Sequence, residues 1–418
     1  MRFYNTLSRT VEPFTPRSNT ISLYVCGITP YDTTHLGHAF TYTVNDILVR
    51  YLELRGLKVR YVQNVTDIDD DILRKAKQVG SDWITVGNQW TTHFMQDMIS
   101  LNVRPPDYYP RATDMIPEIV ALVQQLVEKG LAYESAGNVY FDVHSWPEFG
   151  KLNRLPYGEM LPIANERGNF PNDPKKRDPL DFVLWQAQAA GEPAWDSPWG
   201  MGRPGWHIEC SAMSTKLVGE TIDFHSGGGD LTFPHHECEI AQVEPLTGKK
   251  PFVRIWLHVA MVRYQGEKMS NSLGNLIWVQ ELLKTCSADS VRVYLAGYHY
   301  RQAWEYDESK VKEAEALAAQ FRECISLSGG AGKPLDAIPA WAAFTRAMND
   351  DLNTPAALSV LSDLAAQIRE AAGVKREVRS AQQALRELGS VFGLRFENPQ
   401  VEQRVIEGWG RHMQRFAG

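Results

Sequence analysis

The chain has 418 residues, of which 44% are hydrophobic and 22% are charged, and this balance excludes a disordered or fibrous protein. Its 43 basic and 50 acidic side chains give a net charge of −7, so the surface is not basic overall. No run of about 18 apolar residues predicts a membrane span. Residues 1–5 lack an apolar signal region, so we expect a cytoplasmic protein without membrane partners. The chain has five widely spaced cysteines: Cys26, Cys210, Cys238, Cys286 and Cys324. This number and spacing indicate free thiols or metal ligands and not a set of disulfides.

The first third of the chain predicts a βαβ unit. Residues 21–26 predict a strand, residues 35–55 have the pattern of a helix, and residues 57–65 predict a second buried strand. Two strands joined by a helix within about 45 residues predict a parallel sheet. Helical periodicity returns in three further segments: 68–79, 83–101 and 113–129.

The middle of the chain predicts an insertion in this sheet. Residues from about 130 to 200 are rich in Pro, Gly, Asn and Trp, and their strands are short. The α/β pattern then resumes with helix, strand, helix and strand at 206–216, 221–225, 234–246 and 253–258. We therefore expect a doubly wound, Rossmann-like α/β domain with a parallel sheet and an irregular insertion.

The last third predicts an all-α helical bundle. After about residue 278 the pattern is almost entirely helical, and residues 328–334 have the composition of a flexible linker. Amphipathic segments follow at 340–349, 355–371 and 376–391. The domains expected are a catalytic domain at 1–275 with its insertion at about 96–195, a connecting helical segment at 276–305, and a helical bundle at 306–418.

Two short motifs suit phosphate chemistry. The run from His35 to His38 includes Gly37 and lies where the first helix begins. A glycine lets a ligand approach the backbone, and a helix N-terminus with imidazole donors favours phosphate. Lys268, Ser270, Asn271 and Ser272 occupy a later loop in which a lysine and hydroxyl groups suit a leaving pyrophosphate. Either motif alone also fits a surface loop, but the pair, in this order, resembles the ATP signatures of class I aminoacyl-tRNA synthetases.

Four dispersed side chains are candidates for a metal site. His235 and Glu239 are four residues apart, which places them on one face of a helix. With Cys26 and Cys210 they form a reasonable zinc set of two thiolates, one imidazole and one carboxylate. The alternative is that these isolated residues bind no metal and are packed in the protein core. Cys238 is also a candidate for the thiol ligand assigned to Cys210.

Longer segments resemble the cysteinyl-tRNA synthetase family, including its mycothiol-pathway cysteine ligase branch. They cover much of residues 1 to 395 and lie at 23–39, 61–70, 140–152, 176–185, 195–213, 227–242, 267–275 and 349–358. The resemblance implies that Cys26, Cys210, His235 and Glu239 hold one zinc ion, which binds the thiolate of substrate cysteine and discriminates against serine.

The resemblance also implies roles around ATP and the adenylate. ATP with Mg²⁺ is the expected co-substrate, and catalytic roles fall on His35, His38 and Lys268. The ATP-binding residues implied are His35, Gly37, His38, Lys268, Ser270, Asn271 and Ser272. The residues expected to line the cysteine or adenylate pocket are Thr29, Thr41, Asn64, Thr66, Trp206, Gly228, Asp230 and Val262. Asn271 stands where the family usually has a second lysine, so we expect slower adenylate formation and a faster pyrophosphate exchange in Asn271→Lys.

The acceptor of the cysteinyl group has two main candidates. Glu239 and the helical region favour tRNA(Cys). Residues 26–39 and 295–301 lean towards the ligase branch, which joins cysteine to an amino sugar such as glucosaminyl-inositol. Only 24 residues follow Leu394, so we expect no full anticodon-binding domain. A third hypothesis is a non-catalytic paralogue that binds cysteine or tRNA. We also expect the protein to be a monomer.

Overall fold

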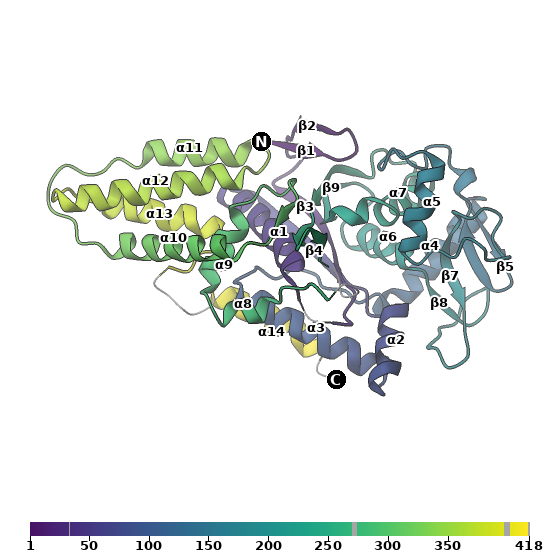
Figure 1. Ribbon diagram of the computed structural model, residues 1–418. Coiled ribbons are helices and arrows are strands. Elements are labelled where there is room, and N and C mark those ends of the chain that lie inside the picture. Colours follow the sequence, from purple (N-terminus) through teal and green to yellow (C-terminus); the bar gives the residue numbers. More distant parts are fainter. Residues whose placement is uncertain (33, 270–273, 397–401, 417–418) are drawn as a thin grey trace.

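A four-stranded parallel sheet forms the centre of the protein in this computed structural model, which describes residues 1–32, 34–269, 274–396 and 402–416 (Figure 1). Its strand order is β10-β9-β3-β4. The strands are β3 (Thr20–Ile28), β4 (Lys58–Val65), β9 (Ile222–Gly228) and β10 (Val253–Val259). The chain builds outwards from β3 to one side and from β9 to the other, so the switch point of a doubly wound sheet lies between β3 and β9. The predicted doubly wound fold is confirmed.

Alternation along β3 assigns its side chains to two different cores. Leu23 and Val25 pack in the core that contains α1 (Leu36–Leu54). Tyr24 and Cys26 belong to the second core, which contains residues of α6 (Trp206–Leu217) and α7 (His235–Thr247). Because successive side chains of a strand face opposite sides of the sheet, this parity turns the Cys26 thiol towards α6 and α7.

The insertion is more regular than its composition predicts. Between β4 and β9 the chain forms the helices α2 (Asp70–Val79), α3 (Trp83–Ser100) and α4 (Ile116–Glu128), and later α5 (Tyr157–Glu166). A four-stranded antiparallel sheet lies at the right of Figure 1 and consists of β5 (Ala132–Ser135), β6 (Asn138–Phe141), β7 (Phe182–Ala187) and β8 (Gly202–Pro204). Strands of three to six residues carry too few alternating positions to be recognised from the pattern alone.

Smaller elements frame the sheet. A hairpin of β1 (Arg2–Asn5) and β2 (Thr10–Pro13) lies beside β10. A three-stranded sheet of β11 (Val262–Tyr264), β12 (Glu267–Lys268) and β13 (Trp304–Glu305) carries Lys268. In the described part of the chain, no helix is both long and apolar enough to cross a membrane.

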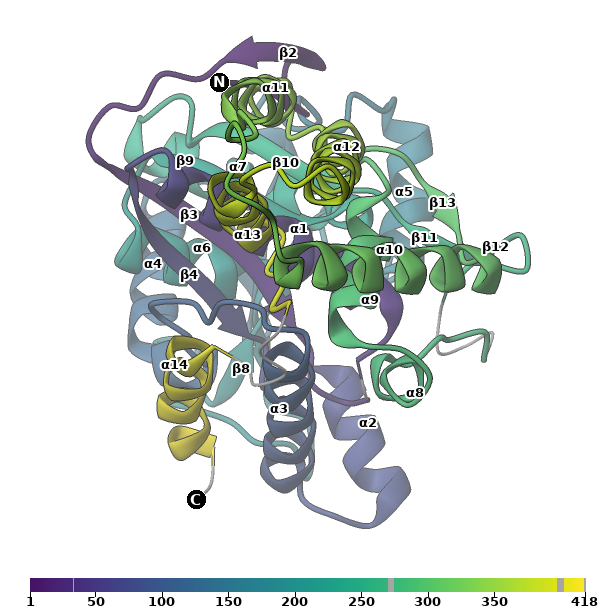
Figure 2. The same ribbon diagram turned by 90° about the vertical axis from the view of Figure 1, so that its left-hand side faces the viewer.

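The C-terminal third is helical, as predicted. After α8 (Val279–Leu283) and α9 (Ala288–Ala296), the bundle comprises α10 (Glu308–Ser326), α11 (Ile338–Asn349), α12 (Thr354–Gly373) and α13 (Arg379–Val391). Figure 2 shows α11, α12 and α13 nearly end-on, with α10 running across them. The segment 328–334 is a loop, as predicted, but hydrogen bonds tie it to the α12–α13 turn. Gly330 N donates to Arg376 O at 2.7 Å, and Gly332 N donates to Lys375 O at 3.2 Å.

The final helix, α14 (Gln403–Met413), returns to the α/β domain beside α3 (Figure 2). Trp409 is fully buried there, and its Nε1–H donates to Val103 O at 2.9 Å. Glu402, which precedes the helix, accepts from Arg50 at 2.8 Å and from Asn102 at 2.9 Å. The two ends of the described chain are therefore packed on the same domain.

Candidate active site

A cavity of about 990 Å³ opens where β3, β9 and β10 end. Ligands bind at this edge of doubly wound sheets because the loops diverge there at the switch point. Eleven of the residues expected from the sequence line it: Cys26, Thr29, His35, Gly37, His38, Thr41, Trp206, Gly228, Asp230, Val262 and Lys268. Segments more than 200 residues apart in the chain thus contribute to one cavity.

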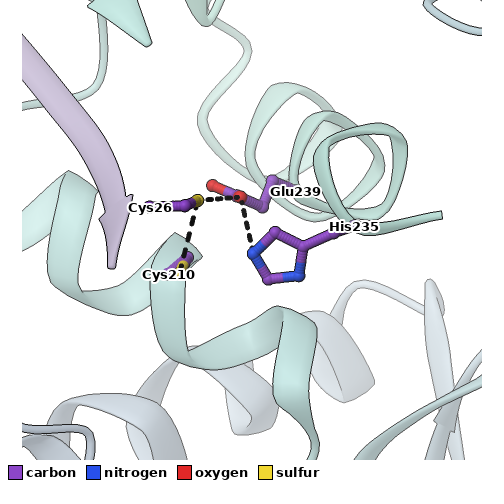
Figure 3. A group of neighbouring side chains, drawn as sticks. All are labelled: Cys26, Cys210, His235 and Glu239. Carbon is purple, nitrogen blue, oxygen red and sulfur yellow. Dashed lines mark hydrogen bonds and ion pairs between the residues drawn. The ribbon is translucent and has the colours of Figure 1, made fainter. Parts of the chain in front are cut away.

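The four candidate metal ligands converge on one another, as Figure 3 shows, and one of them, Cys26, lines the cavity. Their ligand atoms all lie within 4.8 Å of one another. Cys26 Sγ lies 3.9 Å from Cys210 Sγ and 3.8 Å from Glu239 Oε1, and His235 Nε2 lies 3.2 Å from the same carboxylate oxygen. The arrangement follows from strand parity in β3 and from the i, i+4 spacing in α7.

A second layer of side chains orients these four. His207 Nδ1 lies 2.9 Å from His235 Nδ1, which leaves His235 Nε2 on the side of the cluster. His225 Nε2 lies 2.9 Å from Glu239 Oε2, and the Trp206 ring stacks on His235 with centroids 4.4 Å apart. Metal-binding imidazoles and carboxylates are commonly held by such partners, which fix ring orientation.

Burial favours the neutral forms of Cys26, His235 and Glu239. It raises the pKa of the Cys26 thiol and of the Glu239 carboxyl, and it lowers the pKa of the His235 imidazole. A divalent cation would reverse this balance for the thiols and the carboxyl, because it stabilises their deprotonated forms. The donor set of two sulfurs, one nitrogen and one carboxylate therefore fits a thiophilic ion such as zinc.

The structure adds a second possible ligand group that the sequence did not indicate. Cys26 and Glu239 also lie within 4.8 Å of ring nitrogens of His225 and His236. His236 Nε2 is 3.2 Å from Cys26 Sγ. Cys238, which competed for the site on sequence grounds, is buried but belongs to neither group among the described residues. The adjacent histidines at 235 and 236 could have indicated this second ligand group from the sequence. His225 in β9, by contrast, has the sequence context of an ordinary core residue.

The nucleotide side of the cavity begins at the first turn of α1. The ring of His35 caps this helix, and its Nδ1 accepts from the backbone amides of Gly37 at 3.1 Å and of His38 at 3.4 Å. A Cβ on Gly37 would lie 2.9 Å from Cε1 of His35, so glycine makes room for this ring. The amides of Leu36 and Ala39 donate to Ile277 O and His35 O. These four amides are therefore already hydrogen-bonded within the chain, and the imidazoles remain as donors for a phosphate.

Both imidazoles are neutral at physiological pH. Burial, aided by His38, lowers the pKa of His35 to about 2, and burial lowers the pKa of His38 to about 4. The two rings stack with centroids 3.8 Å apart. Since His35 Nδ1 accepts hydrogen bonds, the neutral ring carries its proton on Nε2. His38 Nδ1 is buried without a hydrogen-bond partner among the described residues.

Lys268 reaches the cavity from β12 and is held by Asp230. Lys268 Nζ lies 3.0 Å from Asp230 Oδ2, and Arg167 Nη1 lies 3.0 Å from the same oxygen. Burial alone would raise the pKa of Asp230, but the two cations outweigh it and hold this pKa below its ordinary value. Ser270, Asn271 and Ser272 lie outside the described residues.

Two of the expected pocket residues do not line the cavity. Asn64 and Thr66 are buried at the end of β4. Asn64 Oδ1 accepts from Gly27 N at 2.8 Å, and its amide donates to Thr66 Oγ1 at 3.3 Å. A Cβ on Gly27 would lie 1.5 Å from Asn64 O, so the two backbones touch where the β3–β4 register shifts. Among the described contacts, Asn64 supports the end of β3 that carries Cys26.

Comparison with known proteins identifies the family. Residues 13–316 match the model of the tRNA synthetases class I (C) catalytic domain, and residues 343–397 match the DALR domain. A protein of Dehalococcoides mccartyi (strain ATCC BAA-2100 / JCM 16839 / KCTC 5957 / BAV1), named cysteine–tRNA ligase, is 42% identical over 398 residues, which is 94% of this chain and 86% of that protein. The chain belongs to the cysteinyl-tRNA synthetase family.

Further relatives agree with this assignment to the cysteinyl-tRNA synthetase family. The cysteine–tRNA ligase of Gloeobacter violaceus is 45% identical over 381 residues, which is 88% of this chain and 79% of that protein. Among solved structures, Mycobacterium tuberculosis methionyl-tRNA synthetase in complex with methionyl-adenylate matches with a TM-score of 0.66 at 15% identity, covering 93% of each chain. At this identity, the likeness shows a shared fold.

Proposed function

We propose that this chain activates L-cysteine with ATP, releases pyrophosphate, and transfers the cysteinyl group from cysteinyl-adenylate to tRNA(Cys). One observation carries the proposal: Cys26, which lines the same cavity as His35, His38 and Lys268, belongs to a cluster with the buried side chains of Cys210, His235 and Glu239. A sulfur-binding site beside a phosphate-binding site is what an enzyme needs to join this amino acid to AMP. Family relatives named cysteine–tRNA ligase support the same reaction.

Cysteine selection is assigned to the first ligand group. Cys26, Cys210, His235 and Glu239 would hold one zinc ion, and we prefer this group because it offers two thiolates and has both His207 and Trp206 behind His235. When bound, zinc supplies a Lewis acid that prefers sulfur to oxygen. A site of this kind rejects serine because serine cannot make the same bond.

Activation is assigned to the polar groups of the nucleotide side. The neutral His35 and His38 donate hydrogen bonds to the phosphates as charge moves onto the leaving pyrophosphate, and Lys268 supplies a positive charge. ATP is expected to enter with Mg²⁺. The chemistry needs alignment of the carboxylate and the α-phosphate more than a protein nucleophile.

The remaining expected roles are assigned by position. We expect Gly37, Ser270, Asn271 and Ser272 to bind ATP, as the family resemblance implies. The pocket for cysteine and its adenylate takes Thr29, Thr41, Trp206, Gly228, Asp230 and Val262 as lining residues, and Asn64 and Thr66 as supports behind it. The proposed units are a catalytic domain at 1–275 with its insertion at about 96–195, a connecting segment at 276–305 and a bundle at 306–418, acting as a cytoplasmic monomer.

The reaction can be tested in two steps. Purified protein should exchange pyrophosphate into ATP when L-cysteine is present, and serine should support a rate lower by about a thousandfold or more. It should then transfer radiolabelled cysteine to tRNA(Cys). No exchange with any amino acid would refute activation and leave a binding protein. Exchange followed by transfer to glucosaminyl-inositol, with none to tRNA(Cys), would assign the amino-sugar ligase reaction instead.

A further inference from the structure

Arg167 has no role in the proposed reaction, yet it contacts Asp230, which also binds the proposed catalytic residue Lys268. It follows α5 in the insertion, whereas Lys268 lies in β12 and Asp230 lies just after β9. Arg167 Nη1 and Lys268 Nζ each lie 3.0 Å from one oxygen, Asp230 Oδ2. One carboxylate oxygen therefore joins three segments that are distant in the sequence, and all three residues line the cavity.

The shared oxygen creates a competition between two cations. Lys268 is about two-fifths exposed, and Arg167 and Asp230 are each about one-quarter exposed. Both cations lower the pKa of Asp230 against the effect of burial. The other titratable groups that act on this carboxylate are His35, which caps α1, His38 of α1 and His258 of β10. Burial lowers the pKa of each, and all three are neutral at pH 7. The charge of Asp230 is thus balanced by Lys268 and Arg167.

Lys268 cannot serve a phosphate and keep its full contact with Asp230. Without Arg167, movement of Lys268 to a phosphate would leave the largely buried carboxylate of Asp230 without a counter-charge, and this cost would oppose ATP binding. If Arg167 stays, the carboxylate remains paired. Resting on the proposed function, we infer that Arg167 is a positioning residue, which retains Asp230 and so lets Lys268 move to the phosphates of ATP.

Three substitutions at one position test the inference. Arg167→Ala and Arg167→Gln remove the charge, and we expect either to raise the KM for ATP in cysteine-dependent pyrophosphate exchange by about tenfold. The KM for cysteine should change by less than about twofold. Arg167→Lys keeps a charge for the single Nη1 contact and should restore the KM for ATP to within about threefold. The acid limb of kcat/KM for ATP should move to higher pH in Arg167→Gln, because removal of a cation raises the pKa of Asp230.

The matched control is Arg177→Ala. Arg177 also pairs with an aspartate of the insertion, with Nη1 3.7 Å from Asp142 Oδ2, but it is two-thirds exposed and does not line the cavity. This variant should exchange pyrophosphate like the wild type. ATP affinity measured by calorimetry without cysteine should separate the lysine and glutamine variants of Arg167 even if the alanine variant fails to fold.

Each contrary outcome has a definite meaning. Equal KM values for ATP in the glutamine, lysine and wild-type proteins would overturn the inference while leaving the proposed function intact. A higher KM for cysteine with an unchanged KM for ATP would also overturn it, because the pair would then serve the amino acid. A wild-type protein without cysteine-dependent exchange would instead refute the proposed function.

Discussion

The two ends of the cavity are built in different ways. At the metal end, Cys26, Cys210, His235 and Glu239 are buried and backed by further histidines. At the nucleotide end, Lys268 is partly exposed and rests on Asp230. The metal end is held in place by the packing of two helices on a sheet. The nucleotide end is held by polar contacts that a ligand can replace. In the proposed reaction, cysteine selection would therefore use a preformed site, whereas activation would require Lys268 to exchange Asp230 for a phosphate.

The largest effect is expected at the metal end. Cys210→Ala should abolish stoichiometric zinc binding and lower kcat/KM for cysteine in pyrophosphate exchange by about a thousandfold or more, since the sulfur-selective site is lost. Zinc content measured by mass spectrometry and the exchange rate provide the readouts. Cys286→Ala is the control, because Cys286 is half-buried among helices and belongs to neither ligand group. Full zinc occupancy in Cys210→Ala would favour the second group, which lacks this thiol.

A smaller loss is expected at the nucleotide end. His35→Asn replaces the helix cap by another good cap, so the folded state should retain its stability. The variant nevertheless loses the imidazole donor, and the exchange rate at saturating substrates should fall by about a hundredfold. Thermal unfolding and exchange kinetics separate the two roles. An inactive variant that also unfolds at a much lower temperature would show that His35 serves the fold.

A few-fold effect is expected where an aromatic ring supports a ligand. Trp206 stacks on His235, and Trp206→Phe keeps a smaller ring in that place. The KM for cysteine should rise by about fivefold, in line with the modest energy of aromatic pairs. Trp341→Phe in the helical bundle serves as the control. An unchanged KM would mean that the Trp206 ring does not support the cysteine site.

The two imidazoles at the nucleotide end, His35 and His38, are not expected to change their protonation state between about pH 5 and 8. The pKa of His35 is about 2 and that of His38 about 4, so both rings stay neutral between about pH 5 and 8 and gain a proton only in stronger acid. In NMR spectra of histidine-labelled protein, the signal lost in His38→Gln should not move over this range. A midpoint near 6.5 would contradict the buried, neutral state.

Much of the fold could be predicted because its signals are local. Buried strands, amphipathic helices and the i, i+4 pair in α7 are visible within windows of a few residues. Convergence of Cys26 with Cys210 came from the family resemblance, and strand parity in β3 explains it only once β9 and its helices are placed. The contacts of Arg167, His207 and His225 could not be predicted, because they depend on how the insertion and the helices pack. The contact of Asn64 with the backbone of Gly27, beside the register shift between β3 and β4, could not be predicted from the sequence either.

The central claim is that a metal ion held by two thiolates of this chain selects cysteine. The absorption spectrum of the protein with Co²⁺ in place of zinc tests it most directly. We predict a thiolate-to-cobalt band with the intensity of two sulfur ligands, which grows when L-cysteine is added and stays unchanged with L-serine. A band unaffected by cysteine, or no such band at all, would contradict the account.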